Sequence, residues 1–499
     1  MVDNNIEDIL EQTAAFASQH AGDDCDRLVF NASKYPGVDM ALAVDTILGR
    51  ERISRKVRQF ASVDGLLYPG RLCVEQCSSD ACACYKAFLV SDLLKQDSVS
   101  GIGWNDDMVH ASKAGTFHPV GSVVDITGGL GVDAYYMSFA VPRVCCFERN
   151  TLLALCVRRN FRMLGRDNIE VRNETVSGGN MEALLAGTAP LLVYADPARR
   201  GKTGGRVFAI RDYEPDITSM TERVFAHCRY FLVKISPMED IDAIFNALPQ
   251  CREIHAVSSG GECKELLLVL DREFSGADVG TRKRVAVSLY SKPEGMAASC
   301  RSVCFAGNRK EIRDEYIGNG CFAARFGFTK DEESATAPSF VKSADEIKEG
   351  MSLVIPSPAI LKAGAYNLFA AGNGLKKLDV STHLYLRNGL PSSPAAAKEN
   401  PAGAGVDEDE AGTAAGTGMP DGYGLMKAYR ILEVYLLDKK GLAALSARIQ
   451  GRADVTSKNI PLSSDELSRR LKIKSGGSAH VWGCRAAGKN ILLLTEKNF

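Results

Sequence analysis

The sequence lacks several features that mark specialised classes of protein. Its 499 residues carry a formal net charge of −1, so the chain as a whole is not a polycation and any nucleic-acid surface must be local. No apolar run approaches the length of a membrane span, so we expect no membrane partner. No internal repeat is found. The composition is that of a globular protein, and the length predicts more than one domain.

The first residues lack the features of a secretory leader. They are acidic, and apolar or small side chains recur at the spacing of one helical face, at Ile6, Ile9, Leu10, Thr13 and Phe16. This pattern predicts an amphipathic helix rather than a leader. Fifteen cysteines, an odd number, are typical of reduced thiols in such a chain, so we expect a cytoplasmic protein.

The cysteines also lack the spacing of a metal site. Cys73, Cys77, Cys82 and Cys84 cluster, but they match neither the paired CxxC motif of zinc sites nor the CxxxCxxC motif of iron–sulfur sites. We interpret them as buried or incidental thiols and keep a metal or redox site as the alternative. No metal site is predicted.

The character of the sequence changes several times along the chain. Residues 391–422 consist of Ala, Gly, Pro and acidic residues with almost no large apolar side chain, which is typical of a flexible linker. From Leu425 onward, 14 Lys and Arg stand against 6 Asp and Glu, so the last domain is basic. The predicted divisions are a mostly helical N-terminal domain (1–115), an α/β domain (116–275), a small α+β domain (276–345), a helix with an extended connector (346–390), the linker (391–422) and a basic domain (423–499).

Seven apolar strand-like runs lie in residues 116–275, and helical stretches separate the first six. This alternation predicts an α/β domain with a mostly parallel sheet. Only "GGECK" separates the last two runs, which is too short for a crossover helix. We therefore expect these two strands to form an antiparallel hairpin at the edge of the sheet.

A glycine-rich turn follows the first run, in "DITGGLGVD". Gly128, Gly129 and Gly131 suit a strand-to-helix turn that lies close to a ligand, and Asp125 ends the strand before them. The order does not match the G-x-G-x-x-G dinucleotide motif. Glu148 ends the next strand, where an acid can accept hydrogen bonds from ribose hydroxyls. Nicotinamide enzymes and methyltransferases share this combination, and the expected hairpin favours a methyltransferase.

The fourth run ends in "YADPARRG". Asp196 and Pro197 occupy the position of the (D/N)PP(Y/F) tetrad of amino-methyltransferases, in which the acid and the next carbonyl accept hydrogen bonds from the target amine. The aromatic residue of that tetrad is missing here. Arg199 or Arg200 could stack on a base or bind a phosphate, or could form a surface salt bridge.

Five further residues in three stretches are weaker candidates. Lys234 and Ser236 follow the fifth run and are placed to line the same crevice, although capping and packing explain them equally well. Asn173 or Glu174 follows the third run, where the adenine of a cofactor would lie. Cys263 is a possible nucleophile for methylation at carbon 5 of a pyrimidine.

Taken together, these stretches resemble the bacterial class I S-adenosylmethionine-dependent methyltransferases that carry a C-terminal THUMP-like domain. The motifs concerned are "DITGGLGVD", "FERN", "YADPARRG" and "KISPMED", with "PSPAILKAGAYNLF" and "NIPLSSDELSRRLKIKSGGSAHVW" downstream. The resemblance implies a Rossmann-like core with a seven-stranded, mostly parallel sheet and an edge hairpin, then a small ferredoxin-like domain and a THUMP-like end. It implies S-adenosylmethionine as the cofactor.

The resemblance also assigns roles to residues at the matching motifs. The expected cofactor-binding residues are Asp125, Thr127, Gly128, Gly129, Gly131, Asp133, Glu148, Arg149, Glu174 and Asp196. The expected catalytic residues are Asp196, Pro197, Arg199 and Lys234.

THUMP domains of other enzymes bind structured RNA, so the resemblance predicts methylation of a base in tRNA or rRNA. The base would be flipped toward Asp196, which would orient or deprotonate the attacking amine. The basic end domain would contact phosphates, although a solvated basic surface is the alternative. Three other functions stay open: a methyltransferase for DNA or protein, a non-catalytic module that binds the cofactor or RNA, and a nicotinamide oxidoreductase.

Overall fold

The computed structural model forms two compact units, which are described separately. The first unit comprises residues 1–254, 265–279 and 316–322, and the second comprises residues 255–264, 280–315 and 323–499. The structure describes residues 2–96, 122–199, 210–275, 280–291, 299–305, 308–388, 424–449 and 451–496. The predicted linker 391–422 lies outside these residues. None of the described helices is long and apolar enough to cross a membrane.

The N-terminal region of the first unit is helical, as predicted. Its helices are α1 (Val2–Gln19), α2 (Cys25–Phe30), α3 (Met40–Ser54), α4 (Arg58–Ala61), α5 (Arg71–Gln76) and α6 (Asp80–Gln96). In α1 the side chains of Leu10, Thr13 and Phe16 are buried, as predicted for the apolar face, whereas Ile9 is half-buried and Ile6 is exposed. Asp24 and Asp39 cap α2 and α3 by accepting hydrogen bonds from backbone N–H groups of the first turn.

The seven predicted strands of the α/β domain are all present. They are β1 (Ser122–Asp125), β2 (Val144–Phe147), β3 (Ile169–Arg172), β4 (Pro190–Ala195), β7 (Tyr230–Ile235), β8 (Cys251–Ser259) and β9 (Glu262–Asp271). The helices between them are α7 (Val132–Met137), α8 (Thr151–Met163), α9 (Met181–Ala186), α10 (Ile217–Phe225) and α11 (Ile241–Ala247). Two short strands, β5 (Ala198–Arg199) and β6 (Tyr213–Glu214), form a separate ladder.

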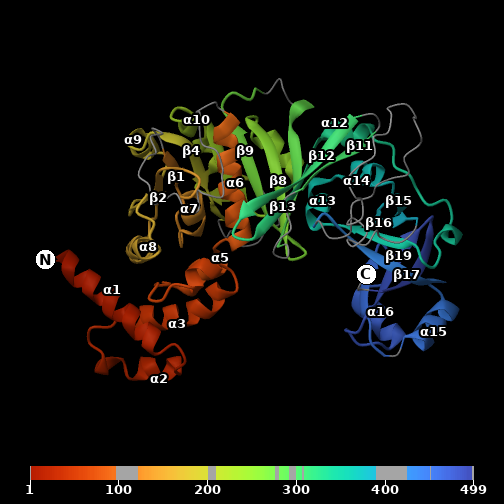
Figure 1. Ribbon diagram of the computed structural model, residues 1–499, viewed down its shortest axis with the longest axis horizontal. Coiled ribbons are helices and arrows are strands. Elements are labelled where there is room, and N and C mark those ends of the chain that lie inside the picture. Colours follow the sequence, from red (N-terminus) through yellow and green to blue (C-terminus); the bar gives the residue numbers. More distant parts are fainter. Residues whose placement is uncertain are drawn as a thin grey trace, which may run out of the picture. The chain divides into compact units, whose positions relative to one another are not determined.

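These strands take the order β8-β9-β7-β4-β1-β2-β3 within the largest sheet. The ladders from β7 through β4, β1 and β2 to β3 are parallel, and β9 runs antiparallel to β7. Gly260 and Gly261, both with positive φ, make the two-residue turn of the predicted hairpin. β1, β2 and β4 are buried almost throughout because helices cover both faces of a parallel sheet. Figure 1 shows α6 crossing the sheet.

Most of the region predicted as a small α+β domain belongs to the second unit. It contains β10 (Lys283–Ser291), β11 (Ser299–Phe305), β12 (Asn308–Gly318), β13 (Cys321–Thr329) and α12 (Lys330–Ala335), although parts of β12 and β13 belong to the first unit. β11 and β12 are paired antiparallel. Thr329 and Glu332 form a reciprocal capping box that starts α12.

A second sheet of seven strands follows. The strands and helices of this region, in chain order, are β14 (Ser352–Pro356), α13 (Pro358–Ala363), α14 (Tyr366–Gly372), β15 (Lys376–Asp379), β16 (Thr382–Arg387), β17 (Met426–Leu436), α15 (Lys439–Arg448), β18 (Asp454–Lys458), α16 (Ser464–Leu471), β19 (Ala479–Ala486) and β20 (Lys489–Glu496). The strand order is β15-β16-β14-β17-β20-β19-β18. The sequence predicted one helix after Pro358, but Gly364, at φ +84°, ends α13 and a second helix begins two residues later.

Candidate active site at the carboxyl ends of the strands

The strand register gathers four acidic residues at one edge of the sheet. Asp125 at the end of β1 lies opposite Cys146 of β2 and Tyr194 of β4. Glu148 and Asp196 each follow these partners by two residues, so both lie just beyond the same edge. Glu174 lies three residues after Val171, which is the β3 partner of Cys146. The carboxyl ends of parallel strands are where α/β proteins bind ligands.

The three glycines of the turn after β1 serve different purposes. A Cβ on Gly128 would lie 2.6 Å from the Sγ of Cys146, and one on Gly131 would lie 2.5 Å from the Cζ of Phe161 in α8. Both glycines are therefore required because neighbouring parts of the protein occupy the space. Gly129 is different: it has φ +53°, and a Cβ there would meet only the carbonyl oxygen of Thr127, at 3.8 Å, which is an ordinary contact. Gly129 is thus the position at which a ligand can approach the backbone.

Thr127 links the ends of β1 and β4. Its Oγ1 donates to Asp125 Oδ1 at 3.2 Å and accepts a hydrogen bond from the backbone N–H of Asp196 at 2.6 Å. Burial, together with the nearby carboxylates of Asp133 and Asp196, raises the pKa of Asp125 to about 7, although the hydrogen bonds from Thr127 oppose this rise. Because of this link, the positions of the two aspartates are set together.

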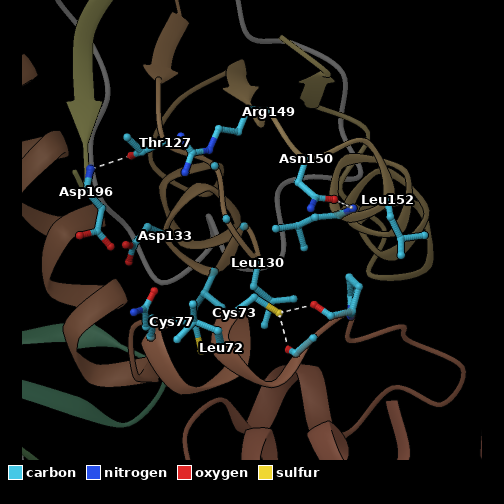
Figure 2. Close-up of a pocket in the computed structure, with 18 of the residues that line it drawn as sticks. Leu72, Cys73, Cys77, Thr127, Leu130, Asp133, Arg149, Asn150, Leu152 and Asp196 are labelled. Carbon is cyan, nitrogen blue, oxygen red and sulfur yellow. Dashed lines mark hydrogen bonds between the residues drawn. The ribbon is translucent and has the colours of Figure 1, made fainter. Parts of the chain in front are cut away.

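Two cavities open at this edge and share Thr127, Gly129, Arg149 and Asp196. The first cavity, of about 600 Å³, also reaches Asp125, Gly128, Gly131 and Asp133. In Figure 2, Leu72, Cys73 and Cys77 lie on one side of it and Thr127 and Arg149 on another. The second cavity, of about 410 Å³, is bordered by Glu148, Glu174 and the loop after β3. Every predicted cofactor-binding residue therefore lines at least one cavity.

The carboxylate of Glu148 is oriented by backbone groups. Gly129 N–H donates to Oε2 at 2.8 Å, and Asn150 N–H donates to Oε1 at 2.7 Å. Asn173, the alternative candidate beside Glu174, instead donates its side-chain amide to the carbonyl of Glu148 at 2.9 Å. Asn173 thus supports the turn, whereas Glu174 faces the cavity.

A buried charge network lies behind the first cavity. Lys86 of α6 is fully buried, and its Nζ donates to both carboxylate oxygens of Glu265 at 2.9 and 3.0 Å and to Ser78 Oγ at 3.0 Å. Asp133 accepts hydrogen bonds from Ser78 at 3.0 Å and from Tyr194 at 2.8 Å, and lies 3.2 Å from Lys86. Burial alone would lower the pKa of Lys86, but Asp133 and Glu265 raise it above its ordinary value.

Lys234 of β7 forms an ion pair with Asp196. The Nζ–Oδ2 distance is 2.6 Å, and the side chains are 15% and 35% exposed. Burial alone would lower the pKa of Lys234, but the carboxylate of Asp196 raises it above its ordinary value. Lys234 does not line either cavity, so it acts on the site through Asp196.

Pro197 and Arg199 also lie outside the cavity walls. Arg199 forms an ion pair with the buried Glu239 at 3.0 Å, and Tyr213 donates to the same carboxylate oxygen. The salt-bridge alternative for Arg199 is therefore the arrangement found here. Arg200 lies outside the described residues.

The clustered cysteines do not form a metal site in the part of the chain that the structure describes, where no group of three or more potential ligands is placed to hold a metal ion. Cys73 and Cys77 line the first cavity, and burial raises the pKa of their thiols to about 12 and about 11. Cys82 and Cys84 are buried. Cys263, at the start of β9, lines neither cavity.

Sequence reasoning missed the network partners Ser78, Lys86, Tyr194 and Glu265, and the cavity residue Leu72. One signal was available: Lys86 interrupts the apolar run "CYKAFLV" of α6, and a charged residue in such a run requires a buried partner. The identity of that partner, 179 residues away, was not visible in the sequence.

The parallel sheet with its antiparallel terminal hairpin and its glycine turn at the end of β1 is the Rossmann-like fold of class I methyltransferases. Two family models match the second unit: a THUMP domain-like model at residues 426–497 and a ferredoxin-like domain model at residues 353–393. The second match lies in the segment predicted as a connector, downstream of residues 276–345, where the sequence placed the ferredoxin-like domain. The prediction overlooked that β14, β15 and β16 pair within one sheet.

The whole chain has a solved structural counterpart. The crystal structure of a "putative methyltransferase from Porphyromonas gingivalis W83" aligns over 98% of this chain and 98% of its own, with a TM-score of 0.71 and 24% identity. This likeness establishes a shared fold. An rRNA methylase from Streptococcus thermophilus aligns over 34% of this chain and 98% of its own, with 15% identity and a TM-score of 0.23, which does not establish a shared fold. No curated protein matches the chain.

Proposed function

We propose that this protein transfers a methyl group from S-adenosylmethionine to an amino group on a base of structured RNA, either tRNA or rRNA. The observation that carries the proposal is the convergence of Asp125, Glu148 and Asp196 on the two joined cavities at the carboxyl edge of a methyltransferase-type sheet. The THUMP domain-like match supports RNA as the substrate class.

The residues at this edge fit the proposed cofactor. Gly129 lines both cavities without a side chain, and the carboxylate of Glu148 is already oriented by two N–H donors while it borders the second cavity. A carboxylate in this position accepts hydrogen bonds from vicinal ribose hydroxyls. Glu174 borders the same cavity and would lie near the adenine. When bound, S-adenosylmethionine supplies an electrophilic methyl group.

Asp196 is the residue that would act on the target amine. It borders both cavities and is 35% exposed, while Lys234 holds one of its carboxylate oxygens at 2.6 Å. A fixed carboxylate can accept a hydrogen bond from an exocyclic amine and orient its nitrogen for transfer. Lys234 is therefore a positioning residue that acts through Asp196.

An amine suits this site better than carbon 5 of a pyrimidine. Methylation at that carbon requires a nucleophilic thiolate, and the two thiols at the first cavity, Cys73 and Cys77, have pKa values raised by burial. Cys263 does not border the cavities. A base inside a stacked helix cannot reach Asp196, so the target base would be flipped out. The basic region from residue 425 onward would contact phosphates, so RNA affinity should fall steeply with salt.

The test is transfer of radiolabelled methyl from S-adenosylmethionine to RNA from a strain deleted for the gene, separated into tRNA and rRNA fractions. We expect label in one fraction, with loss of about 10²-fold or more in Asp196→Ala. Asp167→Ala, at an exposed position outside both cavities, is the matched control and should retain activity. No label in either fraction, from protein that binds the cofactor, would contradict RNA as the substrate and favour DNA, protein or a non-catalytic role.

A further inference from the structure

The N-terminal helical region supplies one wall of the first cavity. Leu72, Cys73 and Gln76 of α5 line this cavity together with the glycine turn and Asp196, and Figure 2 shows Leu72 and Cys73 on the side facing the turn. No residue from 1–96 lines the second cavity, where Glu148 and Glu174 lie. The helical wall is therefore specific to the first cavity.

The charges lining the first cavity indicate what it can bind. Five aspartates and one cationic side chain, Arg149, line it, and two of these aspartates, Asp133 and Asp196, are paired with Lys86 and Lys234. The carboxylates belong to Asp39, Asp45, Asp125, Asp133 and Asp196. Such a lining supplies hydrogen-bond acceptors and favours a ligand that presents N–H donors. A nucleobase with an exocyclic amine meets this requirement, whereas its phosphates would remain outside.

Leu72 is an unusual residue for this wall. Its side chain is 62% exposed although it is large and apolar, and Leu152, across the same cavity on α8, is 40% exposed. Apolar side chains at a cavity mouth lose unfavourable contact with water when a flat ligand covers them. The tetrad at Asp196 lacks the aromatic residue that would otherwise contact a base, so this apolar surface comes from a different part of the chain.

We propose that the first cavity is the pocket for the flipped target base, that the base carries an exocyclic amine, and that Leu72 of α5 provides the apolar contact to its face. The inference rests on the proposed function and deepens it by assigning substrate recognition to the helical N-terminal region. The glycine turn, which lines the first cavity, would then contact the cofactor as well, whereas the α5 wall would contact only the substrate.

The first test reads occupancy of the pocket without requiring catalysis. The variants Leu72→Cys and Leu48→Cys are treated with a maleimide, and modification of each introduced thiol is followed by peptide mass spectrometry. Leu48 is the matched control because it is 42% exposed on α3 but does not line the cavity. The probes are the tRNA and rRNA fractions from the deletion strain and, separately, S-adenosylhomocysteine. We expect one RNA fraction to slow modification at position 72 about tenfold and to leave position 48 unchanged.

The second test separates substrate recognition from cofactor binding. Leu72→Ser should lower kcat/KM for RNA about tenfold, because an apolar contact to the base is lost. Affinity for S-adenosylmethionine, measured by calorimetry, should stay unchanged, and Leu72→Phe should retain activity. Leu48→Ser should behave as wild type in both measurements.

The two tests distinguish failure of this inference from failure of the proposed function. Protection at position 72 without methyl transfer would support the first cavity as the base pocket and would contradict RNA methylation as the activity. Suppose that the wild type transfers methyl but position 72 is not protected, or that position 48 is protected equally. Either result would contradict the assignment of the first cavity as the base pocket. The assignment would also be contradicted if Leu72→Ser lowered the affinity for S-adenosylmethionine by as large a factor as kcat/KM for RNA.

Discussion

The two cavities share four residues but are built from different parts of the chain. The second cavity is bordered by residues that directly follow strands, such as Glu148 after β2 and Glu174 after β3. The first cavity joins the glycine turn to Leu72 and its neighbours in α5, roughly fifty residues earlier in the chain. The comparison indicates that a cavity formed at strand ends can be recognised from local motifs, whereas a cavity walled by α5 depends on packing between regions that are distant in sequence.

The largest effect is expected from disrupting the buried charge network of Lys86 beside the first cavity. Lys86→Met removes the ammonium that pairs with Glu265 and Asp133 and leaves two carboxylates buried without their cation. We expect the free energy of unfolding to fall by about 3–5 kcal/mol, as measured by urea denaturation. Lys95→Met, at an exposed position on the same helix, is the control and should change stability little. Equal stability of the two variants would show that the network is not structural.

The next largest effect on stability is expected at the glycine turn, which lines the first cavity and, through Gly129, the second. Gly131→Ala combines strained φ with overlap against Phe161 of α8, so we expect a loss of about 3 kcal/mol in the free energy of unfolding. Gly129→Ala would place its Cβ at an ordinary 3.8 Å from the carbonyl oxygen of Thr127, so it should cost about 1 kcal/mol, from its positive φ alone. Thermal unfolding of both variants checks the difference. The reverse order would mean that contact with α8 does not require the glycine.

Removing the acid of the second cavity should separate the two cavities functionally. Glu148→Ala deletes a carboxylate that is oriented toward the proposed ribose site, so we expect affinity for S-adenosylmethionine to fall about 10–100-fold, as measured by calorimetry. Glu182→Ala, exposed on α9 and outside both cavities, serves as the control. Unchanged affinity in Glu148→Ala would place the ribose elsewhere.

The smallest effect concerns pH and Asp125, which lines the first cavity. The pKa of Asp125 rises from 3.8 to about 7 on folding, so the folded state holds this proton more tightly than the unfolded state. The stabilising contribution of protonated Asp125 is therefore complete below about pH 4 and is lost as pH rises through about 7.

Asp125→Asn resembles the protonated form at every pH. Its stability relative to wild type should therefore increase between pH 5 and pH 8. Urea denaturation of both proteins at these two pH values measures the difference, and Asp167→Asn should show no such trend. A constant difference would mean that Asp125 has an ordinary pKa in the folded protein.

Local patterns predicted much of the fold and part of the site. All seven strands of the α/β domain and the terminal hairpin were recognisable because buried strands produce apolar runs and because Gly260 and Gly261 mark a tight turn. The acids at strand ends were recognisable because parallel strands bring their carboxyl ends to one edge. Local patterns failed where Gly364 divides a predicted helix and where the ferredoxin-like segment begins.

The sequence by itself determined the class I architecture, the basic end domain and the line of acids at Asp125, Glu148 and Asp196, because each depends on residues close together in the chain. Only the tertiary structure decided that Gly131 is required by α8, that Lys86 neutralises Glu265, and that α5 walls one cavity. The physical reason is that burial and charge pairing depend on distances in space. Residues far apart in sequence meet only when the helices pack against the sheet.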